Sequence, residues 1–249
     1  MTEPIKLKWS VPGEFPALAT REIHLWCADL GEPGGPDPAG AGCLSADEHD
    51  RAASFHFAAD RYRFVAARRN LRHVLAGYVG RDPGSLVFNY GRFGKPNLVH
   101  RADVTGPFDP TLNNLSFNQS HCGSLWLLAV AWNQPVGVDI EEVKELPDLA
   151  VLEEKIFTPE DLPHQRALAA VDRQLGFFQR WTQLEAAAKF LGIGFEPTDR
   201  YVPPDQSELL APAEGYVGAL AYGGTAVRIR RLGWNEALLS TTAAAVTST

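Results

Sequence analysis

Apolar side chains recur at helical spacing along residues 60–79, where they follow each other every three or four positions. A second long helical segment is predicted at residues 172–191. Each segment is followed by a glycine, Gly80 and Gly192, and glycine is common directly after the last residue of a helix. The pattern therefore predicts two long helices with sharp ends.

Shorter apolar runs bounded by Gly, Pro and Asn predict strands at residues 22–30, 125–132, 136–141 and 216–222. Two further helix starts are predicted from capping signals. One opens at Ser45, which precedes two acidic residues, and the other at Thr158, which precedes Pro159. Residues 31–42 consist mainly of Gly, Pro and Ala and are predicted to be a loop.

The order of elements repeats along the chain. The pair Asp60-Arg61 and the later Gly80 recur as Asp172-Arg173 and Gly192, at a shift of about 112 residues. Such self-similarity indicates two copies of one unit. We expect an N-terminal half at 1–132, a connector at 133–135 and a C-terminal half at 136–249, packed as a pseudo-dimer with a site at the seam.

Composition and charge narrow the function classes. The 249 residues are 45% hydrophobic and 21% charged, which is typical of globular proteins. No apolar run approaches the ~18 residues of a membrane helix, and the N-terminus lacks the apolar core of a signal peptide. The net charge of −7 disfavours general nucleic-acid binding. Three widely spaced cysteines fit neither a disulfide framework nor a zinc site, so we expect a reducing cytoplasm. We also expect a monomer.

A basic stretch stands out against this acidic background. Residues 51–81 contain seven arginines, one aspartate and no glutamate. A local basic face on an acidic protein suits a small polyanion. A solvated helix face explains the same stretch equally well.

Carboxylates gather in two later segments. Asp139 and Glu141 alternate with Ile140 along a predicted strand, so both point to one face while Ile140 points to the core. Glu185 and Lys189 lie one helical turn apart on one face. Either pair alone is more often a solvated surface feature. Three carboxylates brought together repel each other unless they hold a hard cation, and Mg²⁺ is bound in this way.

Several common motifs are missing from the sequence. It contains no GxxxxGK[ST] phosphate loop and no GxGxxG fingerprint, so these two nucleotide sites are not supported. It contains no GxSxG or HExxH, which weakens hydrolase and zinc-protease interpretations.

A set of short motifs occurs in a fixed order instead. The motifs are 60–68 (DRYRFVAAR), 94–96 (GKP), 117–121 (FNQSH), 137–141 (GVDIE), 157–160 (FTPE) and 181–189 (WTQLEAAAK) with Gly192. In this order they resemble the Sfp-like 4'-phosphopantetheinyl transferases, over roughly residues 44–195. The resemblance implies an α+β fold of two similar halves, each a small antiparallel sheet packed against a long helix.

The resemblance also implies a reaction. The 4'-phosphopantetheine arm of coenzyme A moves to a serine of an apo acyl or peptidyl carrier protein, and adenosine 3',5'-bisphosphate leaves. Mg²⁺ is the implied cofactor, and no nucleic-acid or membrane partner is expected. The alternative is a non-catalytic protein that binds a carrier protein or coenzyme A.

Roles for individual residues follow from the same resemblance. Asp139, Glu141 and Glu185 would hold the metal, and Glu185 would also serve as the base for the serine. Lys189 would contact the pyrophosphate. Four further residues would hold the other phosphates, and two would border the adenine. The phosphate residues are Ser120, His121, Arg51 and Arg63, and the adenine residues are Lys95 and Pro96.

Two positions depart from the family pattern. Leu184 stands where the family usually has lysine, which removes one cation near the phosphates. Gln119 stands where an aliphatic residue is usual, and we expect it at a strand edge. We expect Leu184 to be partly exposed.

Overall fold

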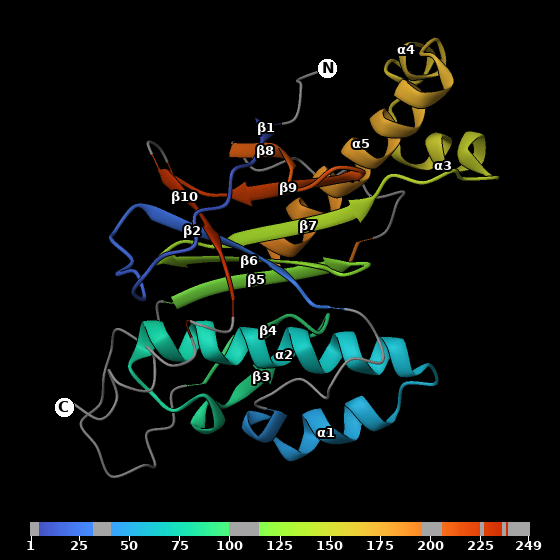
Figure 1. Cartoon of the computed structure of the whole chain (residues 1–249). Coiled ribbons are helices and arrows are strands. Elements are labelled where there is room, and N and C mark those ends of the chain that lie inside the picture. Colours follow the sequence, from blue (N-terminus) through green and yellow to red (C-terminus); the bar gives the residue numbers. More distant parts are fainter. Residues whose placement is uncertain are drawn as a thin grey trace.

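The computed structural model describes residues 5–31, 41–99, 115–195, 206–224, 227–235 and 238. Most of the predicted loop at 31–42 lies outside these residues. Figure 1 shows most strands stacked between two long helices, α2 (Ala58–Val79) and α5 (Ala170–Leu191), while the short strands β3 (Phe88–Tyr90) and β4 (Pro96–Leu98) lie beside α2. The helices are α1 (Ala46–Ala53), α2 (Ala58–Val79), α3 (Leu149–Ile156), α4 (Leu162–Arg166) and α5 (Ala170–Leu191), with two 3-10 turns at Ala41–Cys43 and Pro83–Ser85. The strands are β1 (Ile5–Lys6), β2 (Glu22–Asp29), β3 (Phe88–Tyr90), β4 (Pro96–Leu98), β5 (Leu115–Cys122), β6 (Leu125–Trp132), β7 (Val136–Glu142), β8 (Gln206–Ala211), β9 (Tyr216–Tyr222) and β10 (Arg228–Gly233).

Two four-stranded sheets form the centre of the fold, in the orders β1-β8-β9-β7 and β10-β2-β6-β5. Three strands of each sheet are antiparallel neighbours. The fourth strand of each comes from the opposite end of the chain and pairs in parallel: β1 with β8, and β10 with β2. The expected α+β fold of two similar sheet-and-helix halves is confirmed.

Apolar residues fill three layers of this structure. Between the two sheets, Ile23 and Leu25 of β2 pack with Val138 and Ile140 of β7. The outer face of β2 and β6 is covered by α2, for example where Leu71 packs in the cluster that includes β2 and β6 side chains. On the other sheet, α5 lies against β7 and β9, with small alanines at the contact.

The two long helices end where the sequence predicts. Gly80 and Gly192 both adopt the left-handed conformation, with φ of 60° and 69°, and each cap N–H bonds back into the last turn. Glycine reaches this conformation without a Cβ clash. At the start of α1, the Ser45 backbone N–H donates to Glu48 Oε2 at 3.1 Å. The same carboxylate accepts from Arg72 Nε of α2 at 2.7 Å, and this buried pair ties α1 to α2.

One predicted helix start is wrong. Thr158 and Pro159 form a turn, in which the Asp161 backbone N–H donates to Thr158 Oγ1 at 3.1 Å. The threonine oxygen therefore closes a turn, and α4 begins four residues later, at Leu162. The preceding helix, α3, was not predicted.

Gly137 lets α5 lie directly on β7. A Cβ at this position would be 2.1 Å from the Ala186 carbonyl oxygen and 2.4 Å from the Phe190 nitrogen. Any side chain would therefore push helix and strand apart. This close contact is what brings Glu185 and Lys189 of α5 next to Asp139 of β7.

None of the helices in the described part of the chain is both long and apolar enough to cross a membrane.

Candidate active site

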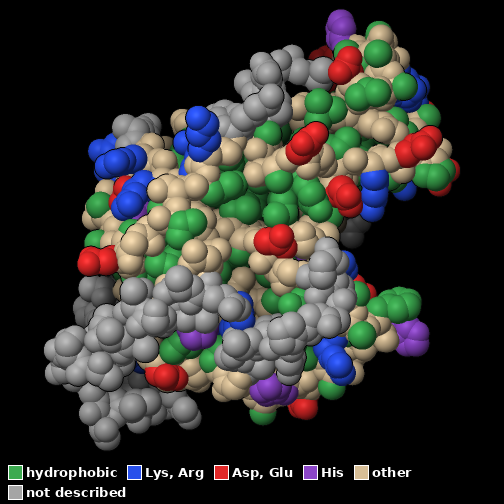
Figure 2. All heavy atoms as spheres, viewed as in Figure 1, with side chains coloured by type: hydrophobic (Ala, Val, Ile, Leu, Met, Phe, Trp, Pro, Cys, Tyr) green, Lys and Arg blue, Asp and Glu red, His purple; other side chains and the backbone are tan. Residues whose placement is uncertain are grey.

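A cavity of about 520 Å³ lies where the two sheets meet. Strands β5 and β7 are the edge strands of their sheets, and the Asn118 side chain of β5 accepts from the Val138 backbone N–H of β7 at 2.8 Å. Residues of α2, the C-terminal part of α5 and the turn between β3 and β4 complete the walls. Figure 2 shows the outline of this face indented between the lobe with α3–α5 and the lobe with α1 and α2. Eight of the predicted site residues line the cavity together: Lys95, Pro96, Ser120, His121, Asp139, Glu141, Glu185 and Lys189.

Asp139 is the most buried acidic side chain of the cavity, with 3% exposure. Its Oδ1 accepts from Lys189 Nζ at 2.6 Å and from Ser120 Oγ at 2.9 Å. The Lys189 ammonium also donates to Ser120 Oγ at 3.2 Å. The second carboxylate oxygen, Oδ2, is buried and has no hydrogen-bond partner among the described residues. Asp139 therefore has one buried oxygen that can still accept a hydrogen bond or bind a cation.

Glu141 and Glu185 flank Asp139 and share its environment. Burial raises the pKa of Glu141, and the negative charge of Asp139 adds to the rise. Burial also raises the pKa of Glu185, partly offset by Lys189, while Asp139 and Glu141 push it up further. Cys122 Sγ lies 3.4 Å from Glu141 Oε2, to which it donates. The charge of Asp139 thus disfavours the charged forms of both glutamates, and Glu141 disfavours that of Glu185.

The donor set fits a hard divalent cation, although the side chains are not arranged around one. Within the described ranges, no group of three His, Cys, Asp or Glu side chains is already placed to hold a metal ion. Lys189 instead supplies the positive charge next to Asp139. The fit rests on the unpartnered Asp139 Oδ2 and on an all-carboxylate donor set, which suits Mg²⁺.

Two basic residues of the cavity have lowered pKa values. Burial lowers the pKa of His121, and the charges of Lys189 and Arg63 lower it further, so the ring is neutral near pH 7. Burial lowers the pKa of Lys95 to about 8. The Lys95 ammonium donates to the backbone oxygens of Lys189 and Val136. Lys95 is thus bonded to the wall of the cavity by its own charged group.

The two predicted arginines lie outside this cavity. Arg51 lines an adjoining cavity of about 360 Å³, which shares Phe64, Arg68 and Gly94 with the first. Arg63 is not among the lining residues of either one, and its Nη1 lies 3.6 Å from Asp60 Oδ1. Arg63 remains close enough to lower the pKa of His121, but the structure does not bring it into the cavity.

The basic stretch does not form one face. Arg69 and Arg72 are buried, with 6% and 1% exposure, and Arg72 is paired with Glu48. Arg68 was not predicted as a site residue, yet it lines both cavities and donates to the Tyr90 hydroxyl at 3.2 Å. Helical spacing could have separated the arginines that face the core from those that face the site. Other lining residues missed from the sequence include Phe64, Phe93, Asn118, Trp181 and Ile193.

Leu184 is buried, and the expectation of partial exposure is wrong. Its side chain is 5% exposed and belongs to an apolar cluster with Phe178 and Val217. Successive residues on a helix point about 100° apart, so Leu184 faces this core while Glu185 faces the cavity. Gln119 lies on the edge strand β5, as expected, and its Oε1 accepts from Trp126 Nε1 at 2.8 Å.

Comparison with known proteins agrees with this geometry. Residues 39–133 match a family described as 4'-phosphopantetheinyl transferase, N-terminal, and residues 135–226 match the 4'-phosphopantetheinyl transferase superfamily. The chain is 35% identical over 221 residues to the 4'-phosphopantetheinyl transferase HetI of Nostoc sp., covering 83% of this chain and 90% of that protein.

The chain belongs to the 4'-phosphopantetheinyl transferase superfamily.

More distant members of the family show the same relationship. The chain is 31% identical over 144 residues to the 4'-phosphopantetheinyl transferase psf-1 of Bacillus pumilus, covering 55% of this chain and 56% of that protein. It is 23% identical over 159 residues to the 4'-phosphopantetheinyl transferase Sfp of Bacillus subtilis, covering 64% and 65%. The resemblance inferred from the motifs, and the expectation of a 4'-phosphopantetheinyl transferase, are confirmed at the level of the family.

Proposed function

We propose that this transferase moves the 4'-phosphopantetheine arm of coenzyme A to a serine hydroxyl of an apo acyl or peptidyl carrier protein. The reaction would depend on Mg²⁺ and release adenosine 3',5'-bisphosphate. The observation that carries the proposal is the cavity at the junction of the two sheets, where Asp139, Glu141 and Glu185 meet Lys189. An anionic cofactor and a hard cation would neutralise each other in such a site.

In the proposed site, Asp139, Glu141 and Glu185 would hold Mg²⁺. The bound ion would polarise the pyrophosphate and offset the charge that develops on the leaving oxygen. The unpartnered, buried Asp139 Oδ2 supports this assignment. Without a metal, the Lys189 ammonium pairs with the Asp139 carboxylate by donating to its Oδ1.

Lys189, Ser120 and His121 supply the polar contacts for phosphate oxygens in this proposal. Lys189 reaches both Asp139 and Ser120 and is half-buried, so a small side-chain movement would direct its ammonium toward a pyrophosphate oxygen. His121 is neutral near pH 7 because of its lowered pKa and would act as a hydrogen-bonding group.

Transfer forms a bond between the carrier serine oxygen and the phosphorus of the phosphopantetheine group. The bond from that phosphorus to the bridging oxygen breaks, and the adenosine bisphosphate leaves with the electron pair. The serine proton passes to Glu185, directly or through water. Burial raises the pKa of Glu185, which makes it a better base, whereas binding a metal would make it a poorer one.

The non-catalytic alternative has no specific support in the structure. That alternative was based on Leu184, which stands where the family usually has lysine and was expected to remove a cation from the site. Because Leu184 lies in the apolar core, its replacement of lysine removes no charge from the described cavity wall. A monomer in the cytoplasm remains our expectation. The free thiols of Cys27, Cys43 and Cys122 agree with a reducing compartment.

The test is a transfer assay with a panel of apo carrier proteins from fatty-acid, polyketide and peptide synthesis. Purified protein is incubated with Mg²⁺ and coenzyme A, and each carrier is measured by intact mass. The proposal expects one carrier to gain a single phosphopantetheinyl group. A carrier whose acceptor serine is replaced by alanine, and a reaction with excess chelator, are the controls. A parent protein that binds coenzyme A but modifies no carrier would favour the binding function instead.

A further inference from the structure

The turn between β3 and β4 is tied to the C-terminal half of the chain through Lys95. The turn itself is closed by the Gly91 N–H, which donates to the Lys95 carbonyl at 2.9 Å. The Lys95 ammonium donates to the backbone oxygen of Lys189 at 2.5 Å and to that of Val136 at 3.2 Å. These oxygens belong to the last turn of α5 and to the first residue of β7.

A second contact joins the same two segments. Phe93 lies in the β3–β4 turn, and a Cβ added to Gly194 would be 2.8 Å from Phe93 Cδ1. The ring therefore sits directly on the backbone that follows α5. The strand pair β3–β4 belongs to neither four-stranded sheet. Lys95 and Phe93 are thus two points at which this small hairpin is held on α5.

The chemistry at Lys95 favours a strong contact. The Lys189 carbonyl accepts a long hydrogen bond of 3.3 Å from the Gly192 cap N–H, so it can also accept from the Lys95 ammonium. A cation at the last turn of a helix also interacts well with the helix dipole. Hydrogen bonds from an ammonium group are stronger than those between neutral groups. Lys95 is half-buried, and burial lowers its pKa to about 8, while its ammonium donates to the two carbonyl oxygens.

Both sides of this contact line the main cavity. Phe93, Gly94 and Lys95 form one wall, and Lys189 and Ile193 form the adjoining one. The bonds of Lys95 therefore set how far the hairpin lies from α5, and so the width of the cavity between them.

We propose that Lys95 is a positioning residue that latches the β3–β4 turn onto the end of α5, and so shapes the cavity for coenzyme A. This inference rests on the proposed function only in taking coenzyme A as the ligand of the cavity. It differs from a direct role, in which Lys95 would contact coenzyme A beside the adenine and the turn would be held without its ammonium.

A double-mutant cycle separates the two roles. Lys95→Met removes the ammonium but keeps the length of the side chain, and Phe93→Ala removes the second contact of the turn. The dissociation constant for coenzyme A is measured by calorimetry for the parent, both single variants and the double variant. If the turn is latched, Lys95→Met weakens binding by on the order of tenfold. The double variant is then weaker than the worse single variant by less than about twofold, because both changes release one segment.

Two further variants and a control sharpen the result. Lys95→Arg keeps a cation that can donate to both carbonyls and should recover most of the affinity. Gly194→Ala places a methyl group against the Phe93 ring and should weaken binding in the parent, but not further in Lys95→Met. Lys155→Met, at an exposed lysine on α3, is the control and should bind as the parent does.

The outcomes decide between the roles and the function. The latch is overturned if the affinity losses of the two single variants multiply, to within about twofold, in the double variant. It is also overturned if Lys95→Met binds coenzyme A as tightly as the parent. In both cases a parent that is active in transfer keeps the proposed function. A parent that neither binds coenzyme A nor modifies any carrier overturns both. Melting temperatures measured on every variant show whether a loss of affinity comes from unfolding.

Discussion

Replacing Leu184 by lysine should destabilise the protein rather than add a useful cation to the site. The Leu184 side chain is 5% exposed and packs in a cluster with Ile156, Phe177, Phe178 and Val217. Losing a buried leucine costs about 1.5–3 kcal/mol, and a desolvated polar group in its place adds at least about 1–3 kcal/mol. The sum of about 2.5–6 kcal/mol would lower the Tm of a chain of this size by roughly 5–24 °C.

Thermal melting and transfer rate, measured on the same preparations, test this prediction. Leu184→Met is the matched control, because it conserves volume and should cost less than about 1.5 kcal/mol. Transfer is assayed below the melting range of the weakest variant. The reasoning about the buried side chain is refuted if Leu184→Lys melts within about 2 °C of the parent and transfers faster, since the new ammonium would then reach the cavity.

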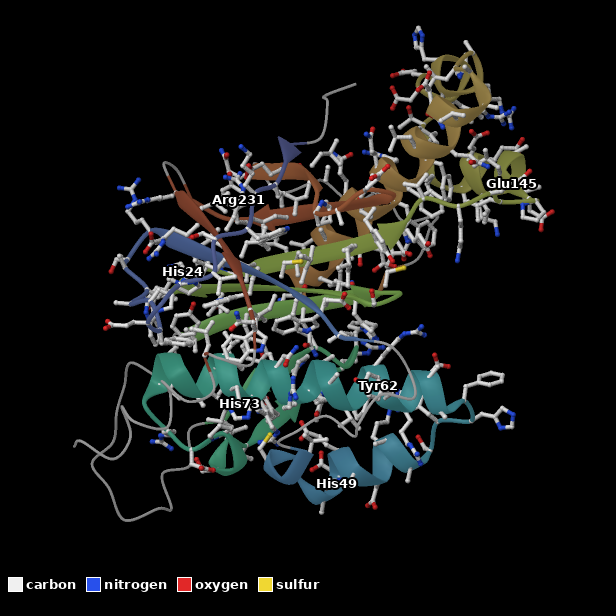
Figure 3. All side chains as sticks on the ribbon, viewed as in Figure 1. His24, His49, Tyr62, His73, Glu145 and Arg231 are labelled. Atoms are coloured by element: carbon white, nitrogen blue, oxygen red, sulfur yellow. The ribbon has the colours of Figure 1, made fainter. Side chains whose placement is uncertain are left out.

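Four further predictions follow from the site and the core. Asp139→Asn or Glu185→Gln should slow transfer on the order of 100-fold or more, because each removes an anionic ligand of the proposed metal site; Glu185→Gln should keep the parent Tm, whereas Asp139→Asn also breaks the buried ion pair with Lys189 and should lower it; near-parent turnover at saturating Mg²⁺ would contradict the metal assignment. Arg51→Ala should weaken binding of coenzyme A more than binding of dephospho-coenzyme A, which lacks the 3'-phosphate that Arg51 would hold. Equal losses of affinity for the two cofactors in calorimetry would show that Arg51 does not contact the 3'-phosphate. His24, which faces α2 from β2 (Figure 3), has its pKa lowered by burial from 6.5 to about 4, so the folded form resists protonation. Stability should therefore fall by about 3 kcal/mol as the pH drops from about 6.5 to 4, and His24→Gln should flatten this dependence in denaturant melts; an unchanged slope would assign it to other groups. Gly137→Ala should cost about 1–3 kcal/mol and reduce Mg²⁺-dependent transfer, because its Cβ collides with the α5 backbone; unchanged melting and activity would show that helix and strand can separate freely.

Local signals in the sequence located most of the secondary structure. Helices α2 and α5 end at Gly80 and Gly192, as their left-handed caps require, and α1 begins directly after Ser45. Strands β6 and β9 span the predicted residues. Thr158 was misread, because the same capping oxygen can close either a turn or a helix, and neighbouring residues do not distinguish the two.

The composition of the site was also accessible from sequence, through the order of its motifs. Alternation along β7 and helical spacing along α5 place Asp139, Glu141, Glu185 and Lys189 on faces that can meet. Their meeting depends on the absence of a Cβ at Gly137, which becomes informative only when α5 is seen lying on β7.

Tertiary structure alone decided which side chains face the site and which face the core. The rotation of α5 on its sheet buries Leu184, and the packing of α2 separates Arg72 in the core from Arg68 at the cavity. It also decided that Lys95 bonds to backbone oxygens 41 and 94 residues away. Sequence periodicity reports the local conformation of a segment. The partner of each face is chosen by burial and hydrogen bonding summed over the whole chain, so a helix sequence specifies its faces but not what they touch.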